Sequence, residues 1–145
     1  MATMDDVRRL VTLDHGLASL ATSRADGRSH VTVVNAGVIE HPVTGGPVAA
    51  FVGRPGTRKL VHLRARSHAT LSWRAGWAWC TVEGDAELIG PDDPVQGVTL
   101  PPLLRSIYAS SGGGEHDDWA DYDRVMAAER RLAVLVHPAR IYVNP

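Results

Sequence analysis

The stretch G-T-R-K-L-V-H-L-R, residues 56–64, brings together residue types that bind phosphate groups. Lys59 is the only lysine of the 145 residues, and it directly follows Arg58. Thr57 is placed to cap a helix that runs to about residue 66, whose first turn offers free N–H groups beside these two cations. Cations are unfavourable at the start of a helix unless an anion offsets them. The stretch therefore predicts either an anion site or a solvated helix start whose cations pair with surface carboxylates.

Composition limits the kind of protein to which this stretch can belong. With 44% hydrophobic and 21% charged residues, residues 1–145 have the size and core-forming capacity of one globular domain. The formal net charge of −1 and the lack of a basic arm argue against nucleic acid or a membrane surface as the main partner. Neither a long apolar run nor a signal-peptide pattern occurs, so we expect a cytoplasmic protein.

The remaining polar residues suggest no second centre of chemistry. Cys80 lies in an apolar run and is expected to be a small buried side chain, and no Cys/His spacing predicts a metal site. The seven histidines offer no distinctive haem ligand. Glu83, Asp85 and Glu87 alternate along a strand, where we expect them to be solvated or paired with arginines. No catalytic acid can be nominated from the sequence.

Periodicity and turn residues predict a mainly β (α+β) fold. Runs typical of strands cover residues 17–22, 30–34, 37–40, 47–52, 69–73, 77–89, 132–136 and 140–143. Helical patterns cover residues 4–13, 57–66, part of 95–110, and 117–131. Gly84 inside a long strand indicates a bulge, and the sequence H-P-A is expected to form a turn near the C-terminus. We expect six or seven antiparallel strands in a small barrel, with two to four short helices at its periphery.

The sequence resembles a known superfamily over most of its length. F-V-G-R-P-G-T-R-K-L-V-H-L, residues 51–63, is similar to the strand, turn and helix that hold a flavin phosphate in the pyridoxamine 5'-phosphate oxidase-like split β-barrel proteins. The hairpin L-A-S-L-A-T-S-R-A-D-G-R-S-H-V-T-V-V and the strand W-C-T-V-E-G-D-A-E-L-I also resemble that superfamily. The segment H-D-D-W-A-D-Y-D-R-V-M-A-A-E-R-R-L-A-V-L-V-H-P-A-R-I-Y resembles its short branch, which is assigned to the deazaflavin F420.

This resemblance implies a homodimer with a cofactor at each subunit interface. It assigns Arg58 and Lys59 to the cofactor phosphate, with Thr57 beside them and Arg54 as a weaker candidate. It also assigns Val31, Thr32, Val33, Val34 and Asn35 to the edge and face of the cofactor ring. Further arginines are expected to serve the anionic tail of F420. Trp77, which lies between Trp73 and Trp79, is expected either to form an aromatic wall near the ring or to pack in a core or dimer interface.

The function implied by the resemblance is hydride transfer between F420 and a small conjugated organic substrate. FMN is the alternative cofactor. Other interpretations are an F420 carrier without turnover, or an FMN-, FAD- or haem-binding relative in tetrapyrrole metabolism. The chain ends A-R-I-Y-V-N-P and lacks the W-R-L type of motif, so we do not expect oxidation of vitamin B6 phosphates.

Overall fold

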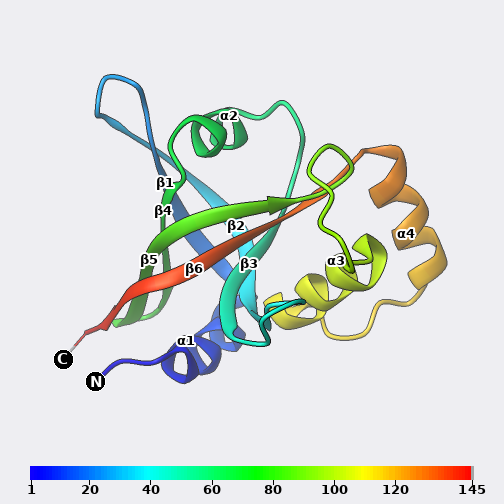
Figure 1. Cartoon of the computed structure of the whole chain (residues 1–145). Coiled ribbons are helices and arrows are strands. Elements are labelled where there is room, and N and C mark those ends of the chain that lie inside the picture. The colour runs from blue at the N-terminus through cyan, green and yellow to red at the C-terminus, as the bar shows by residue number, and fades with distance from the viewer. Residues whose placement is uncertain (145) are drawn as a thin grey trace.

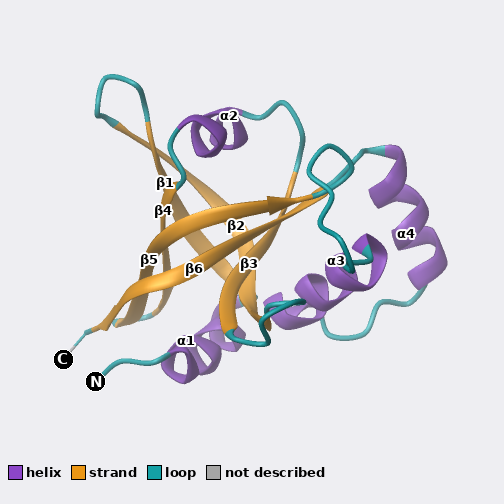
Figure 2. Ribbon diagram, viewed as in Figure 1, coloured by secondary structure: helices purple, strands orange, loops and turns teal. Residues whose placement is uncertain are grey.

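The computed structural model describes residues 1–144 and contains a closed barrel of six antiparallel strands (Figure 1). The strands follow the order β1-β2-β3-β6-β5-β4 around the barrel. They are β1 (Leu17–Ser23), β2 (Ser29–Glu40), β3 (Pro47–Gly53), β4 (His68–Ala75), β5 (Ala78–Ile89) and β6 (Leu132–Val143). The helices are α1 (Met4–Val11), α2 (Arg58–Ala65), α3 (Leu100–Tyr108) and α4 (Trp119–Ala128), with short turns η1 (Thr12–Asp14) and η2 (Ala109–Gly113). This arrangement confirms the predicted mainly β barrel with short helices (Figure 2).

Two predicted strand boundaries are wrong. Residues 30–34 and 37–40 belong to the single strand β2, and the C-terminal residues from 132 to 143 form the single strand β6. The predicted H-P-A turn is absent because Pro138 pairs with Gly84 at a register shift between β5 and β6. The predicted bulge at Gly84 is confirmed, since an added Cβ there would lie 1.7 Å from the carbonyl oxygen of His137. A bulge is one of the few places where a strand tolerates proline.

The barrel interior forms the main hydrophobic core. Phe51, Leu71 and Trp73 are almost fully buried, and Trp73 donates a hydrogen bond from Nε1 to the carbonyl oxygen of Ala36 over 3.0 Å. The helices α1 and α2 lie over opposite ends of the barrel (Figure 1) and add their apolar side chains to this core. Each such side chain contributes about 1.5–3 kcal/mol by its burial. Trp73 is therefore a core residue, as the packing interpretation of the tryptophan cluster predicted.

The outer surface of the barrel has two halves. We call the first the covered wall: it is the outer face of β3 with the adjoining halves of β2 and β6, where Ile39, Ala50 and Leu135 pack in a second core with α3 and α4. We call the second the bare wall: it is the outer face of β1 and of residues 29–35 of β2. Its side chains Val31 and Val33 are 60% and 66% exposed. Helices thus protect one half of the barrel and leave the other half open.

The strand β2 changes partner between these two halves. Residues 29–35 pair with β1, whereas residues 36–40 pair with β3. The backbone edge of residues 29–35 that faces away from β1 therefore has no strand partner. Within residues 1–144, no helix is long and apolar enough to cross a membrane.

Candidate functional site

A tight turn connects β3 to α2 and determines where the helix begins. The backbone N–H of Thr57 donates to the carbonyl oxygen of Arg54 over 3.4 Å, and Gly56 has a φ of 79°. Proline followed by a glycine with positive φ is the pattern of a type II turn. The hydroxyl of Thr57 also donates to the carbonyl oxygen of Arg54, over 2.9 Å. The side chain of Thr57 therefore closes the turn.

The start of α2 is left without a cap from the protein. Thr57 occupies the N-cap position, but no side chain accepts a hydrogen bond from the first turn of the helix. That turn contains no acidic residue; it contains Arg58 and Lys59 instead. The first N–H groups of a helix have no partner within the helix, and the dipole makes this end positive. An anion would satisfy both the N–H groups and the two cations.

Arg58 and Lys59 also lack carboxylate partners in the described chain. The eight arginines that do form ion pairs with carboxylates are Arg8, Arg9, Arg54, Arg64, Arg105, Arg124, Arg130 and Arg131. Within residues 1–144, the start of α2 therefore does not match the alternative prediction, in which its cations pair with surface carboxylates. Arg54 differs from its neighbours, because its Nη2 lies 3.4 Å from Oε1 of Glu129.

The predicted ring-contact residues divide between the two faces of β2. Val31, Val33 and Asn35 point outward onto the bare wall, whereas Thr32 and Val34 point inward. Asn35 is held in place, since its Nδ2 donates to the carbonyl oxygen of His15 over 2.6 Å. Thr32 and Val34 can therefore meet a ligand on the bare wall only through their backbone, at the edge of β2 that lacks a strand partner.

A pocket of 330 Å³ lies where the bare wall meets α3 and α4. Its lining includes Asn35, Val52, Tyr108, Met126 and Arg131. Arg131 donates from Nε to Glu129 over 2.8 Å, and Glu129 also contacts Arg54 in the turn before α2. The volume is at the lower end of the range of small-molecule sites, about 300–1,000 Å³. The pocket and the start of α2 are thus connected through one carboxylate.

The structure separates Trp77 from the start of α2 in the same chain. Trp77 is 94% exposed at the tip of the β4–β5 hairpin. The residues that follow it, Ala78 and Trp79, line a groove together with Leu10 of α1. This hairpin is therefore at the α1 end of the barrel, opposite α2 (Figure 1). A single chain does not bring Trp77 together with Arg58 and Lys59.

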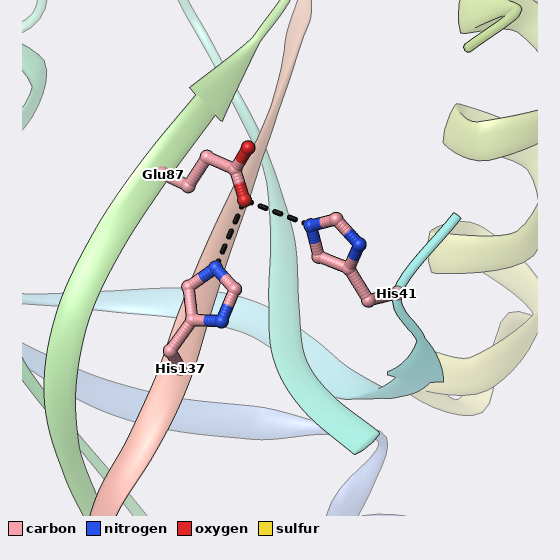
Figure 3. A group of neighbouring side chains, drawn as sticks. All are labelled: His41, Glu87 and His137. Carbon is pink, nitrogen blue, oxygen red and sulfur yellow. Dashed lines mark hydrogen bonds and ion pairs between the residues drawn. The ribbon is translucent and has the colours of Figure 1, made fainter. Parts of the chain in front are cut away.

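A second polar cluster was missed by the sequence analysis. The Nε2 atoms of His41 and His137 lie 2.8 and 2.9 Å from the same oxygen of Glu87 (Figure 3). These residue types could hold a metal ion, and their ligand atoms lie within 4.8 Å of one another. None of the acidic residues Glu83, Asp85 and Glu87 pairs with an arginine in the part of the chain that is described. The two histidines lie 46 and 50 positions from Glu87, so local spacing gives no signal for the cluster.

Hydrogen bonding favours a structural role for this cluster over a metal site. Nδ1 of His41 accepts from the backbone N–H groups of Val43 and Thr44, over 3.1 and 3.2 Å. In a neutral imidazole the ring proton then lies on Nε2, which donates it to Glu87. A histidine that binds a metal instead donates from its other ring nitrogen. Burial opposes the charge on Glu87, but hydrogen bonds from both histidines leave its pKa below the usual value.

Fold and site together define a split β-barrel protein with an open, basic helix start, which Arg54 and Glu129 link to a pocket. The sequence profile of the pyridoxamine 5'-phosphate oxidase family matches residues 4–143, and the chain belongs to this family.

Solved structures share this fold at low sequence identity. The conserved hypothetical protein Rv2991 from Mycobacterium tuberculosis has a TM-score of 0.71 and 20% identity, over 99% of this chain and 84% of that one. An F420 reductase has a TM-score of 0.61 and 15% identity, over 91% of this chain and 93% of that one. A heme binding protein from Mycobacterium smegmatis has a TM-score of 0.62 and 14% identity, over 99% of this chain and 55% of that one. At these identities the likeness establishes the fold alone.

Proposed function

We propose that the protein is an oxidoreductase that binds coenzyme F420 and transfers a hydride between this deazaflavin and a small conjugated organic substrate. The observation that carries the proposal is the start of α2, where Arg58 and Lys59 stand beside uncapped N–H groups without a carboxylate partner in residues 1–144. This arrangement has the chemistry of a phosphate site. The F420 assignment is supported by the resemblance of residues 116–142 to the F420 branch and by the fold shared with an F420 reductase.

The chain's own residues would bind and orient the cofactor. Arg58, Lys59 and the first N–H groups of α2 would hold the phosphate. Val31, Val33 and Asn35 would line one side of the ring, and the unpaired backbone edge of β2 would offer it hydrogen bonds. When bound, the deazaflavin supplies the hydride chemistry, while the protein supplies orientation and electrostatics. The pocket beside Asn35 is the site we assign to the small substrate.

We also propose that two chains associate through the bare wall. Leu17, Val31 and Val33 form an exposed apolar surface on it, and such surfaces commonly mark interfaces. Trp77 is exposed at the α1 end of the barrel, opposite α2, and would be available to contact a second copy. In such a dimer the predicted role of Trp77 beside the ring would be fulfilled between chains and not within one.

The test begins with the identity of the cofactor. Purified protein is titrated with F420, FMN, FAD and haem, while tryptophan fluorescence and co-elution are measured. We expect F420 to bind most tightly; retention of FMN or haem alone would refute the F420 assignment.

Turnover is tested separately. Reduced F420 is mixed with enones, quinones and biliverdin in the presence of the protein, and oxidation of the cofactor is followed by absorbance. We expect oxidation with at least one conjugated substrate. Tight binding without any turnover would favour the carrier interpretation.

A further inference from the structure

A second cavity lies between the neighbouring helices α3 and α4 (Figure 1). We call it the α3–α4 cavity, and we call the 330 Å³ pocket beside Asn35 the substrate pocket. The α3–α4 cavity has a volume of 140 Å³, and its apolar lining is contributed mainly by Leu100, Pro101 and Leu104 of α3 and by Met126 and Ala127 of α4. An engineered apolar cavity of about 150 Å³ in another protein stays dry and binds benzene. The α3–α4 cavity therefore has the size and the chemistry for one small apolar group.

The two charged residues at this cavity, Asp123 and Arg131, are engaged by partners outside it. Asp123 accepts hydrogen bonds from Arg105, one of them from Nε over 2.9 Å, and these bonds hold the pKa of its carboxyl group below the usual value. Nε of Arg131 donates to Glu129 over 2.8 Å. Neither Arg105 nor Glu129 lines the cavity. Each charge is thus compensated by a partner outside the cavity, and the space between α3 and α4 is suited to an apolar group.

Shared side chains separate the α3–α4 cavity from the substrate pocket. Met126 and Arg131 line both spaces. The hydroxyl of Tyr122, which lines the pocket, donates over 3.1 Å to the carbonyl oxygen of Leu104, which lines the cavity. Arg131 and Tyr122 are thus held by hydrogen bonds, whereas Met126 is a partly buried side chain that packs against the second core. Methionine is unbranched and adapts its shape to its neighbours, so Met126 is the part of this partition that moves most easily.

We propose that the α3–α4 cavity is an apolar subsite of the substrate pocket, and that Met126 determines how far a substrate extends into it. This inference rests on the proposed function, because it takes the substrate pocket as the place of the reacting group. The substrate class that it names is a conjugated molecule whose non-reacting end is a ring or an alkyl chain of about six carbons, the size of benzene. The shared lining supports this occupant, since a chain that passes Met126 from the pocket enters an apolar space of matching size.

The first test measures binding to the cavity without cofactor or substrate. Met1, Met4 and Met126 are the three methionines of the chain, so labelling of their methyl groups with carbon-13 gives three NMR signals, which Met126→Leu assigns. We expect benzene to shift the Met126 signal in a saturable way and to leave the signal of Met4, which is buried in the barrel core, unchanged. Ala127→Phe, which places a ring at the cavity, should abolish this shift. The matched control is Ala128→Phe, at an exposed position of α4 that lines neither space, and it should preserve the shift.

Two results of this measurement would overturn the inference. One is a Met126 signal that does not respond to benzene in the wild type. The other is a response that Ala127→Phe leaves unchanged, because the benzene would then be bound elsewhere.

The second test measures how the subsite affects turnover. Enones with alkyl chains of increasing length are compared by kcat/KM with reduced F420 as the hydride donor. We expect kcat/KM to rise by up to about four-fold for each methylene that is buried, and to level off at about six carbons, when the cavity is full. Met126→Ala should move this limit to longer chains, and Ala127→Phe should remove the dependence on chain length. Ala128→Phe should retain it.

The two tests separate this inference from the proposed function. If reduced F420 is oxidised with none of the substrates, hydride transfer is refuted, whereas a saturable shift of Met126 by benzene would still support the apolar site. If the wild type turns over all enones with the same kcat/KM whatever their chain length, the apolar subsite is refuted and hydride transfer stands.

Discussion

The helices α1 and α2 are both eight residues long and cover opposite ends of one barrel, yet they begin in opposite ways. In α1, Thr3 forms a capping box with Asp6, and the acidic first turn is followed by basic residues in the last turn. Ion pairs of Asp5 with Arg8 and of Asp6 with Arg9 complete this arrangement. In α2 the threonine at the N-cap does not cap, and the first turn contains Arg58 and Lys59.

This difference indicates that the start of α1 serves helix stability, whereas the start of α2 serves ligand binding. Every feature at the start of α1 stabilises a helix by itself, through the cap, the dipole and pairs three residues apart. The start of α2 lacks these features, so α2 depends on Leu60 and Leu63, which pack into the barrel core. The positive end of α2 is thereby left available to a ligand.

The largest expected effect comes from removing the anchor of each helix. Leu60→Ala and Leu10→Ala should each lower the free energy of unfolding by about 2–5 kcal/mol, because both delete buried side chains. Only Leu60→Ala should also weaken cofactor binding, since only α2 carries the proposed phosphate site. Urea unfolding and fluorescence titration measure the two effects, and equal loss of binding in both variants would contradict the division of roles.

The next effect concerns the charge at the start of α2. Lys59→Ala should weaken binding of a phosphate-bearing cofactor by about ten-fold or more, through loss of a charge-assisted contact. Arg124→Ala, which removes a cation from α4, is the matched control and should leave the affinity unchanged. Unaltered affinity of the Lys59 variant in isothermal titration would exclude Lys59 from the site.

Removing the two N-cap threonines tests the comparison directly. Thr3→Ala should cost about 1 kcal/mol of stability, because it removes a side-chain cap. Thr57→Ala should cost less, since its hydroxyl closes a turn and does not cap α2. Thermal or urea unfolding of both variants gives the ranking, and a reversed order would mean that Thr57 supports the helix more than its contacts indicate.

Reversing one charge should make α2 resemble α1. Lys59→Glu places a carboxylate at the positive end of the helix and should stabilise the ligand-free protein by about 0.3–1 kcal/mol. The same variant should lose cofactor binding, because the carboxylate would repel a phosphate. A variant that is less stable than the wild type would show that Lys59 has a favourable partner in the ligand-free protein.

The smallest effect should appear in the dependence of stability on pH. The pKa of His62 is lowered below 6.5, chiefly by burial, so the unfolded chain takes up a proton there more readily. Stability should therefore fall as the pH drops below about 6.5, and His62→Gln should flatten this part of the curve. In α1, the hydrogen bond from the Thr3 backbone lowers the pKa of Asp6 below 3.8. The stability that the ionised Asp6 contributes is therefore lost only as the pH falls below 3.8. Urea unfolding between pH 3 and pH 7.5 separates the pH range of His62 from that of Asp6. If stability depends on pH near 6.5 as steeply in the His62 variant as in the wild type, His62 is not the cause of that dependence.

The sequence predicts best what depends on near neighbours. The start of α2 follows from four consecutive residues, and the bulge from one glycine, so both were predictable. The continuous strands β2 and β6 were not, because only one half of each belongs to the covered wall. Residues 36–39 and 132–136 are buried on both faces, so they do not alternate with the exposed residues of the same strand. This change of pattern was interpreted as the end of a strand.

The polar contacts that escaped prediction join residues that are distant in the sequence. His41, Glu87 and His137 meet through strand order and a turn, and no spacing in the sequence brings them together. Similarly, Arg66 donates a hydrogen bond from Nε to the carbonyl oxygen of Ser23, 43 positions away in the sequence. Cation type and local turn chemistry predict Arg58 and Lys59 as anion-binding residues, but which side chains surround them depends on the fold.

The single lysine also has a consequence for chemical labelling. Since Lys59 carries the only side-chain amine of the chain, a lysine-directed reagent would modify one side chain, at the start of α2. The rate of that modification would then report occupancy of this helix end directly, without any engineered probe. Acetylation, which removes the charge of a lysine, would act on the same atom, so this one amine would be the point at which such a modification could regulate the site.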